Sequence, residues 1–170
     1  VESMNPDYCK DTSNTTLNFH NGRILSAWYN AGRVYSLDPL TLETEGEQDF
    51  AGGLDTPMNA HGKTDPRTGE FINYGYADFQ PWLTYYVIGA DGSVKHRTRI
   101  DLPGPRLPHD TTITPNFTIL HDFPLFHDVD VLKRTGHRVV QFKRDLPTRF
   151  GVIPRYGTQE QVRWFEFEPG

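Results

Sequence analysis

The chain has 170 residues, enough for one domain or for part of a larger one. Lysine and arginine number 17 and aspartate and glutamate 22, so the net charge of −5 and the lack of a basic block argue against a nucleic-acid partner. No apolar run approaches the roughly 18 to 20 residues of a membrane-crossing helix. The single cysteine excludes an intrachain disulfide and fits a reducing, cytoplasmic location, with peripheral membrane contact of a full-length protein left open.

Short stretches rich in apolar and aromatic residues predict strands along the whole chain, whereas 13 prolines and 15 glycines leave few windows for a helix. The predicted strands cover 23–29, 34–37, 70–76, 83–89, 93–102, 111–114, 117–123, 138–143, 150–154 and 162–167. Asn21-Gly22 and Asp91-Gly92 are typical of tight hairpins. The one helical turn that we expect covers 128–134. The sequence therefore predicts an all-β fold of antiparallel hairpins.

The predicted strands group in fours. One unit covers residues 58–102 with its first strand near 58–61, and the next begins near 108 and takes 138–143 as its third strand. A four-stranded unit that repeats every ~40 to 50 residues is typical of a β-propeller blade. At a repeat of about 48 residues the chain makes about three and a half blades, fewer than the 4 to 8 that close a propeller. We therefore expect residues 1–170 to be a single partial domain, an incomplete propeller from a longer protein.

Two of the seven histidines occupy equivalent places in successive units. His61 and His109 are 48 residues apart, each at or just before the first strand of its unit. Because the first strand of a blade lies nearest the propeller axis, both side chains are expected to converge on the central channel. Imidazole nitrogens suit iron, zinc or copper. The alternative is a core histidine bonded to a backbone carbonyl, and a metal would in any case need further ligands from elsewhere.

The other histidines fit simpler roles. His20 lies beside a hairpin tip and His96 in a strand with a polar face, so both are expected to be solvated, while His137 lies in a loop. His-Asp pairs occur in metal phosphohydrolases, but on helices, and here they fall in strands and turns. We therefore expect His121 to make a local hydrogen bond and His127 to begin a turn.

From about Asn14 to its C-terminus the chain resembles the carotenoid cleavage oxygenases, a family of apocarotenoid- and stilbene-cleaving dioxygenases that includes the retinal-pigment-epithelium isomerase. The resemblance rests on eight segments in order: NTTLNFHNGRILSAWY, YSLDPLTLET, DFAGGL, NAHGKTDPRTGEFINYGY, LTYYVIGADGSVKHRTRIDLPGP, PHDTTIT, HDFPLF and VRWFEFEP. It implies a seven-bladed propeller that holds a non-haem Fe(II) with four histidines. His61 falls on the first ligand of the pattern AHPK-x-D-x-x-TGE and His109 on the second, in HD-x-x-IT, and the remaining two would follow Gly170.

The resemblance also implies an activity. It implies an Fe(II)-dependent dioxygenase that cleaves a conjugated carbon–carbon double bond of an apolar carotenoid or apocarotenoid, using dioxygen and giving carbonyl products. It indicates no catalytic residue beyond the metal ligands and puts Thr15 near the open coordination positions. Stilbene-cleaving members tend to carry lysine in place of Trp28, which favours a polyene over a hydroxystilbene.

Other functions stay open. A stilbene- or phenylpropanoid-cleaving dioxygenase of the same family and a non-catalytic binding propeller are the main alternatives. A calcium-dependent hydrolytic propeller ranks last, because it would need Asp, Asn and Glu at the starts of blades, where this chain has histidine.

Two departures from the family pattern bear on the site. After LSAW the family usually has a glutamate that orients a ligand imidazole, whereas this chain has Tyr29 and then Asn30, and a phenol is a poorer acceptor than a carboxylate. The proline after the first histidine is Gly62 here, which we expect to affect the backbone only. With half of the ligands, the chain alone is expected to be inactive.

Overall fold

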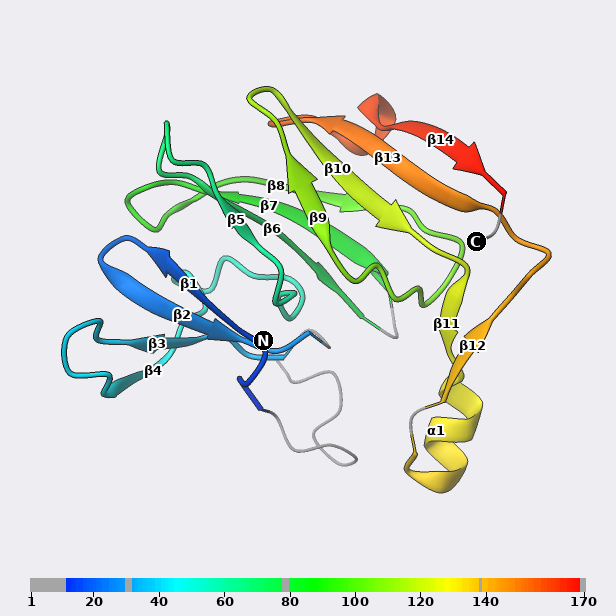
Figure 1. The fold of residues 1–170 in the computed structure, drawn as a ribbon, viewed down its shortest axis with the longest axis horizontal. Helices are drawn as coiled ribbons and strands as arrows, with labels where there is room; N and C mark the ends of the chain where they lie inside the picture. Colours follow the sequence, from blue (N-terminus) through cyan, green and yellow to red (C-terminus); the bar gives the residue numbers. More distant parts are fainter. Residues whose placement is uncertain (1–11, 30–31, 78–79, 138, 169–170) are drawn as a thin grey trace.

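The structure, a computed structural model, describes residues 12–29, 32–77, 80–137 and 139–168. Three four-stranded antiparallel sheets follow one another along the chain, and a two-stranded ribbon with a helix projects beside the third sheet (Figure 1). Each sheet has the size and strand order of one propeller blade. The all-β class and the number of about three blades are thus confirmed.

The first blade consists of β1 (Thr16–His20), β2 (Arg23–Ala27), β3 (Tyr35–Leu37) and β4 (Thr44–Glu47), hydrogen-bonded in that order. The hairpin between β1 and β2 turns at Asn21 and Gly22, whose φ angles are 47° and 73°. A two-residue hairpin loop requires such positive φ values, and asparagine and glycine adopt them most readily. The predicted position of this turn is therefore confirmed.

The second blade consists of β5 (Lys63–Thr64), β6 (Phe71–Tyr76), β7 (Leu83–Ile88) and β8 (Val94–Ile100). Every residue of β6 and β7 is buried, because this blade lies between the other two. Its first strand begins at Lys63, so the prediction of a first strand near 58–61 was wrong. That segment instead leads into the blade, and it carries buried residues such as Met58 and Ala60.

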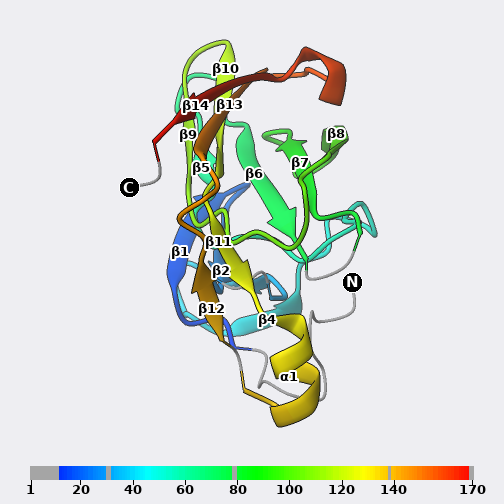
Figure 2. The same cartoon turned by 90° about the vertical axis from the view of Figure 1, so that its right-hand side faces the viewer.

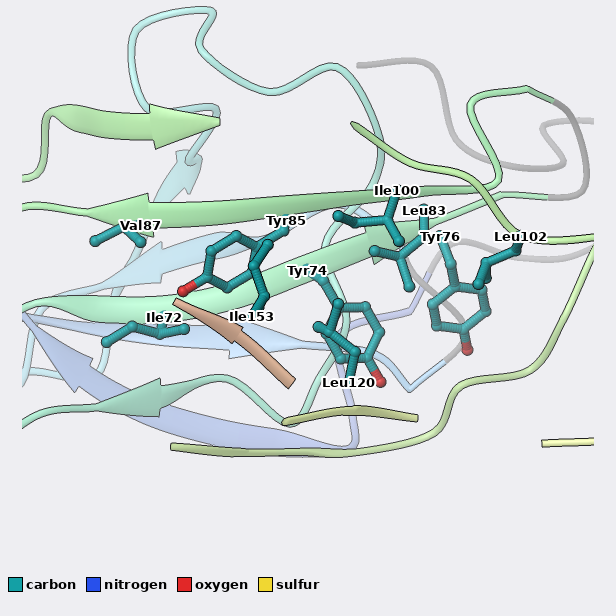
Figure 3. Close-up of a cluster of buried hydrophobic side chains, with 10 residues drawn as sticks. All are labelled: Ile72, Tyr74, Tyr76, Leu83, Tyr85, Val87, Ile100, Leu102, Leu120 and Ile153. Atoms are coloured by element: carbon teal, nitrogen blue, oxygen red, sulfur yellow. The ribbon is translucent and has the colours of Figure 1, made fainter. Parts of the chain in front are cut away.

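The side chains of β6 and β7 alternate between two hydrophobic cores. The core toward the third blade, drawn in Figure 3, consists of Ile72, Tyr74, Tyr76, Leu83, Tyr85, Val87, Ile100, Leu102, Leu120 and Ile153. The core toward the first blade consists of Leu25, Ala27, Val34, Phe50, Met58, Ala60, Phe71, Tyr86 and Ile88. Successive residues of a strand point to opposite faces of the sheet, which explains why a continuous apolar run serves both cores.

The third blade consists of β9 (Thr111–Ile113), β10 (Phe117–Asp122), β13 (Thr148–Pro154) and β14 (Arg163–Phe167), and a short 3-10 helix, η1 (Gln159–Gln161), precedes β14. Residues 138–143 were wrongly predicted as its third strand, since β13 pairs with β10 in that place.

An insertion separates β10 from β13. It consists of β11 (Leu125–His127), α1 (Val129–Thr135) and β12 (Val140–Phe142). Figure 1 shows it projecting beside the third sheet, and in Figure 2 its helix α1 again lies at the bottom edge of the molecule. The predicted helical turn is confirmed: Asp128 caps α1 by accepting a hydrogen bond from the Val131 N–H at 2.9 Å.

Among the described residues no helix is long and apolar enough to span a membrane.

The first strands of the three blades lie side by side, since β5 contacts β1 on one side and β9 on the other. The segments that lead into these strands are therefore close in space although they are far apart in the sequence.

Candidate metal centre

His61 and His109 lie in equivalent positions, each two residues before the first strand of its blade, β5 and β9. Their imidazole rings are neighbours, with centroids 4.7 Å apart and planes inclined by 45°. The sequence predicted that these two side chains converge, and the structure brings them together.

The His61 imidazole has a nitrogen with no hydrogen-bond partner. Its Nε2 atom is buried and unpaired among the described residues. Burial lowers the pKa of His61, and the nearby charges of His109 and Lys63 act in the same direction while Asp110 opposes them. The ring is therefore neutral near pH 7, which is the form that binds a metal ion.

These observations test whether the pair fits a transition-metal ion. Imidazole nitrogens bind such ions at about 2 Å, so two rings on one ion lie within a few ångströms of each other, as these rings do. A core histidine would bond its ring nitrogen to a backbone carbonyl, but the buried Nε2 of His61 has no such partner among the described residues. An unpaired nitrogen beside a second imidazole is what a pair of iron ligands requires. Within the part of the chain that the structure describes, no group of three histidine, cysteine or acidic residues could hold a metal. The pair fits half of a four-histidine site.

Lys63 connects the two histidine segments on one side. Its ammonium donates to the His61 carbonyl at 2.8 Å and to the Asp110 carboxylate at 2.7 Å. Burial alone would raise the pKa of Asp110, but Lys63 and the Thr111 N–H hydrogen-bond to its carboxylate and lower that pKa on balance.

Asn59 connects the same segments from the buried side, a role that no sequence motif marks. Its side chain contacts the His61 N–H and the His109 carbonyl. The available signal was its position two residues before His61, because an asparagine side chain often bonds to the backbone N–H two residues later.

Tyr29 and Thr15 lie on the first-blade side of His109. The Tyr29 ring centroid is 5.8 Å from that of His109, and the Tyr29 N–H donates to Thr15 Oγ1 at 3.1 Å. Thr15 directly precedes β1, as the histidines precede β5 and β9. Tyr29 thus lies beside the predicted ligand His109, at the position where the family usually has glutamate. Asn30 lies outside the described residues.

Three predictions for other histidines were wrong. His20 is buried, not solvated, because its ring packs at 5.6 Å from that of Phe71 in the second blade. His96 is half-buried, and its Nε2 lies 2.8 Å from the Gly157 carbonyl. His121 has a buried Nδ1 without a partner among the described residues and stacks on Phe123 instead of making the expected hydrogen bond.

His127 ends β11 and Asp128 caps α1, which begins at Val129, so the predicted turn at this pair is a helix start. His137 is exposed, in accordance with the loop that the sequence predicted. Among the ring contacts of the described residues, none of the five other histidines contacts His61 or His109.

Gly62 is buried, and the expectation that it affects the backbone only was wrong. A side chain at this position would collide with the Phe71 and Asn73 side chains of β6. Glycine here lets the His61 segment lie directly on the second blade.

Comparisons with known proteins agree with this architecture. The family described as retinal pigment epithelial membrane protein matches residues 3–170. Carotenoid 9,10(9′,10′)-cleavage dioxygenase 1 of Phaseolus vulgaris is 36% identical over 170 residues, covering 98% of this chain and 31% of the relative. Resveratrol cleavage oxygenase 1 of Aspergillus fumigatus is 35% identical over 164 residues, covering 94% and 32%.

Among solved structures, the lignostilbene dioxygenase of Pseudomonas brassicacearum matches with a TM-score of 0.83 and 34% identity, covering 91% of this chain and 33% of that protein. The chain thus spans about a third of the length of the relatives it matches. Its three sheets correspond to about three blades of their seven-bladed propeller. The chain belongs to the carotenoid cleavage oxygenase family.

Proposed function

We propose that residues 1–170 are part of a longer non-haem Fe(II)-dependent dioxygenase, in which His61 and His109 are two of four histidine ligands. The observation that carries this proposal is the 4.7 Å separation of the two imidazoles at the starts of adjacent blades. Iron bound there would supply the activation of dioxygen for oxidative cleavage of a conjugated carbon–carbon double bond to two carbonyl products.

The residues of this chain hold and orient the ligands. Burial keeps the His61 imidazole neutral, and its unpaired Nε2 is available for a metal. Asn59 bonds to the backbone of both histidine segments. Lys63 connects the His61 carbonyl to the Asp110 carboxylate. We place Thr15 near the open coordination positions, where its hydroxyl, bonded to the Tyr29 N–H, would border the dioxygen site.

The substrate that we propose is an apolar carotenoid or apocarotenoid. Trp28 has no charged group that could ionise a substrate phenol, which disfavours the lysine-assisted cleavage of a hydroxystilbene. The relatives named for resveratrol and lignostilbene cleavage keep a stilbene or phenylpropanoid as the second candidate. We further propose a cytoplasmic enzyme, a location that is compatible with peripheral membrane contact of the full-length form.

The test uses the full-length protein that carries these residues, with His61→Ala and His109→Ala made separately. We expect each variant to lose bound iron and oxygen uptake, whereas His137→Ala, a change at an exposed loop histidine, should keep both. If iron content and oxygen uptake survive in both ligand variants, the proposal is lost.

A second assay separates the enzyme from a non-catalytic binding propeller. The full-length protein is incubated with a carotenoid, or with a hydroxystilbene, under air and under nitrogen, and aldehyde products are measured. Oxygen-dependent aldehyde from the carotenoid supports the main proposal, and aldehyde from the hydroxystilbene alone supports the second candidate. Binding without product in either case would indicate the binding module.

A further inference from the structure

A buried asparagine joins the two histidine segments. Asn59 is fully buried, and its Oδ1 accepts a hydrogen bond from the His61 N–H at 2.6 Å. Its Nδ2 donates to the His109 carbonyl at 3.1 Å and to the Tyr74 hydroxyl at 3.2 Å. The amide orientation follows from these partners, because a backbone N–H needs an oxygen and a carbonyl needs an N–H donor.

Tyr74 extends the connection to Asp110, the residue after His109. This tyrosine is buried in β6, and its hydroxyl donates to the Asp110 carbonyl at 3.0 Å while it accepts from Asn59. Asn73 supports the arrangement from the same strand, since its Nδ2 donates to the Asn59 carbonyl at 2.7 Å. The two consecutive carbonyls of residues 109 and 110 are thus bonded by Asn59, in the segment that leads into the second blade, and by Tyr74 of β6.

These bonds have a direct geometric consequence. The His61 N–H and the His109 carbonyl bond to one rigid amide group, so the backbones that carry the two imidazoles cannot shift independently. The Asn59 and Tyr74 side chains are themselves shielded from water, because both residues are buried. A buried polar network with every member paired specifies one arrangement of the groups it joins.

We propose that Asn59 and Tyr74 are positioning residues that set the separation and mutual angle of the His61 and His109 imidazoles and thereby the affinity for the metal ion. This inference rests on the proposed function. Groups that hydrogen-bond the imidazole of a ligand histidine typically contribute about 10- to 100-fold to metal affinity. Asn59 and Tyr74 act through the backbone of the ligand segments, so removing the Tyr74 hydroxyl or the Asn59 donor should weaken binding by about tenfold, the lower end of that range.

The test compares variants of the full-length protein, using Co²⁺ as a spectroscopic probe and Fe²⁺ for activity. Tyr74→Phe removes one hydroxyl, and Asn59→Asp keeps the acceptor for the His61 N–H but loses the donor to the His109 carbonyl. The matched control is Tyr85→Phe. Tyr85 is equally buried in β7 and bonds across the same pair of blades, to the Arg155 carbonyl at 2.9 Å and to Thr118.

We expect Tyr74→Phe and Asn59→Asp to raise the Co²⁺ dissociation constant about tenfold, to alter the Co²⁺ absorption spectrum, and to lower kcat with little change in KM. Tyr85→Phe should lower Tm while leaving Co²⁺ affinity and spectrum unchanged. The inference is overturned if both site variants lower Tm as the control does but bind Co²⁺ like the wild type, which would make the network merely structural.

A failure of the proposed function looks different. In that case the wild-type protein itself would fail to bind Co²⁺, or His61→Ala and His109→Ala would bind it unchanged. Normal loss of Co²⁺ in the histidine variants together with wild-type behaviour of Tyr74→Phe and Asn59→Asp would refute the positioning role alone.

Discussion

Gly62 lies directly against Phe71, so closely that a Cβ atom on Gly62 would be 2.3 Å from Cζ of the phenyl ring. Phe71 is buried in the core between the first and second blades and also packs against His20. The Phe71 ring therefore has little room to move. The segment that carries His61 can lie this close to the ring only because residue 62 has no side chain.

Gly62→Ala in the full-length protein should lower the free energy of unfolding by about 1 to 3 kcal/mol, the usual cost of overpacking a core. It should also weaken metal binding, because relief of the collision moves the backbone next to His61. Phe71→Leu shortens the opposing side chain, so the double variant should be more stable than the sum of the two single changes. Strict additivity in urea denaturation would contradict the proposed contact.

Arg155 links the third blade to the second through a buried network. Its guanidinium contacts the Asp65 carboxylate at 3.1 Å, the Glu70 carboxylate at 3.0 Å and the Thr114 carbonyl at 2.6 Å. Hydrogen bonds from the side chain and backbone of Arg67, together with Arg155, hold the pKa of Asp65 well below its usual range, although burial opposes them. The charged form of Asp65 is thus the one that the fold stabilises.

The pH dependence of this network has a definite sign. Because the pKa of Asp65 is lower in the folded protein than the value of about 3.9 in an unfolded chain, its stabilising effect is complete above that pH and is lost as the pH falls below it. Asp65→Asn should therefore be less stable than the wild type at pH 7, with the two urea midpoints converging below about pH 4. Glu166→Gln, a change at an exposed carboxylate on β14, controls for the removal of one charge. Parallel curves down to the lowest pH would exclude this role for Asp65.

His20 is expected to make stability depend on pH as well, here through a base whose protonated form is positively charged. Burial lowers the pKa of His20, while the Gly89 carbonyl and the Asp91 carboxylate oppose the shift. The unfolded chain takes up a proton at roughly pH 6.5 and the folded protein only at lower pH, so stability should be complete above that value and decline as the pH falls. His20→Phe keeps a ring beside Phe71 and cannot take up a proton. Its stability should fall less than that of the wild type between pH 7.5 and 5.5, and equal slopes for the two proteins would contradict the assignment.

Much of this architecture follows from local sequence patterns. The Asn21-Gly22 turn and the 48-residue repeat predicted hairpins and blades, because positive φ preferences and strand periodicity are properties of neighbouring residues. The same repeat placed His61 beside His109, since equivalent positions in adjacent blades are close in space.

Other features depend on contacts between residues that are far apart in the sequence, which local patterns do not predict. Residues 140–142 do form a strand, β12, but strand propensity alone does not predict the strand with which β12 pairs. It pairs with β11, outside the blade. His20 lies beside a hairpin tip and is nevertheless buried, because Phe71, 51 residues later, covers it. Asn59 and Tyr74 bond to backbone groups of residues 109 and 110, contacts that only the packing of two blades creates.

The last prediction concerns the 170-residue chain by itself. His61 and His109 supply two imidazoles, and the described residues contain no group of three side chains that could hold a metal. Since loss of a single outer hydrogen bond already costs about 10- to 100-fold in affinity, absence of two direct ligands should make the isolated chain bind Fe²⁺ more than about 100-fold more weakly than the full-length protein. Equilibrium dialysis against Fe²⁺ under nitrogen measures this, with the His61→Ala chain as the control for unspecific binding. We expect no oxygen uptake with a carotenoid from the isolated chain, and a tight 1:1 iron complex that His61→Ala abolishes would mean that these two blades hold the metal without further ligands.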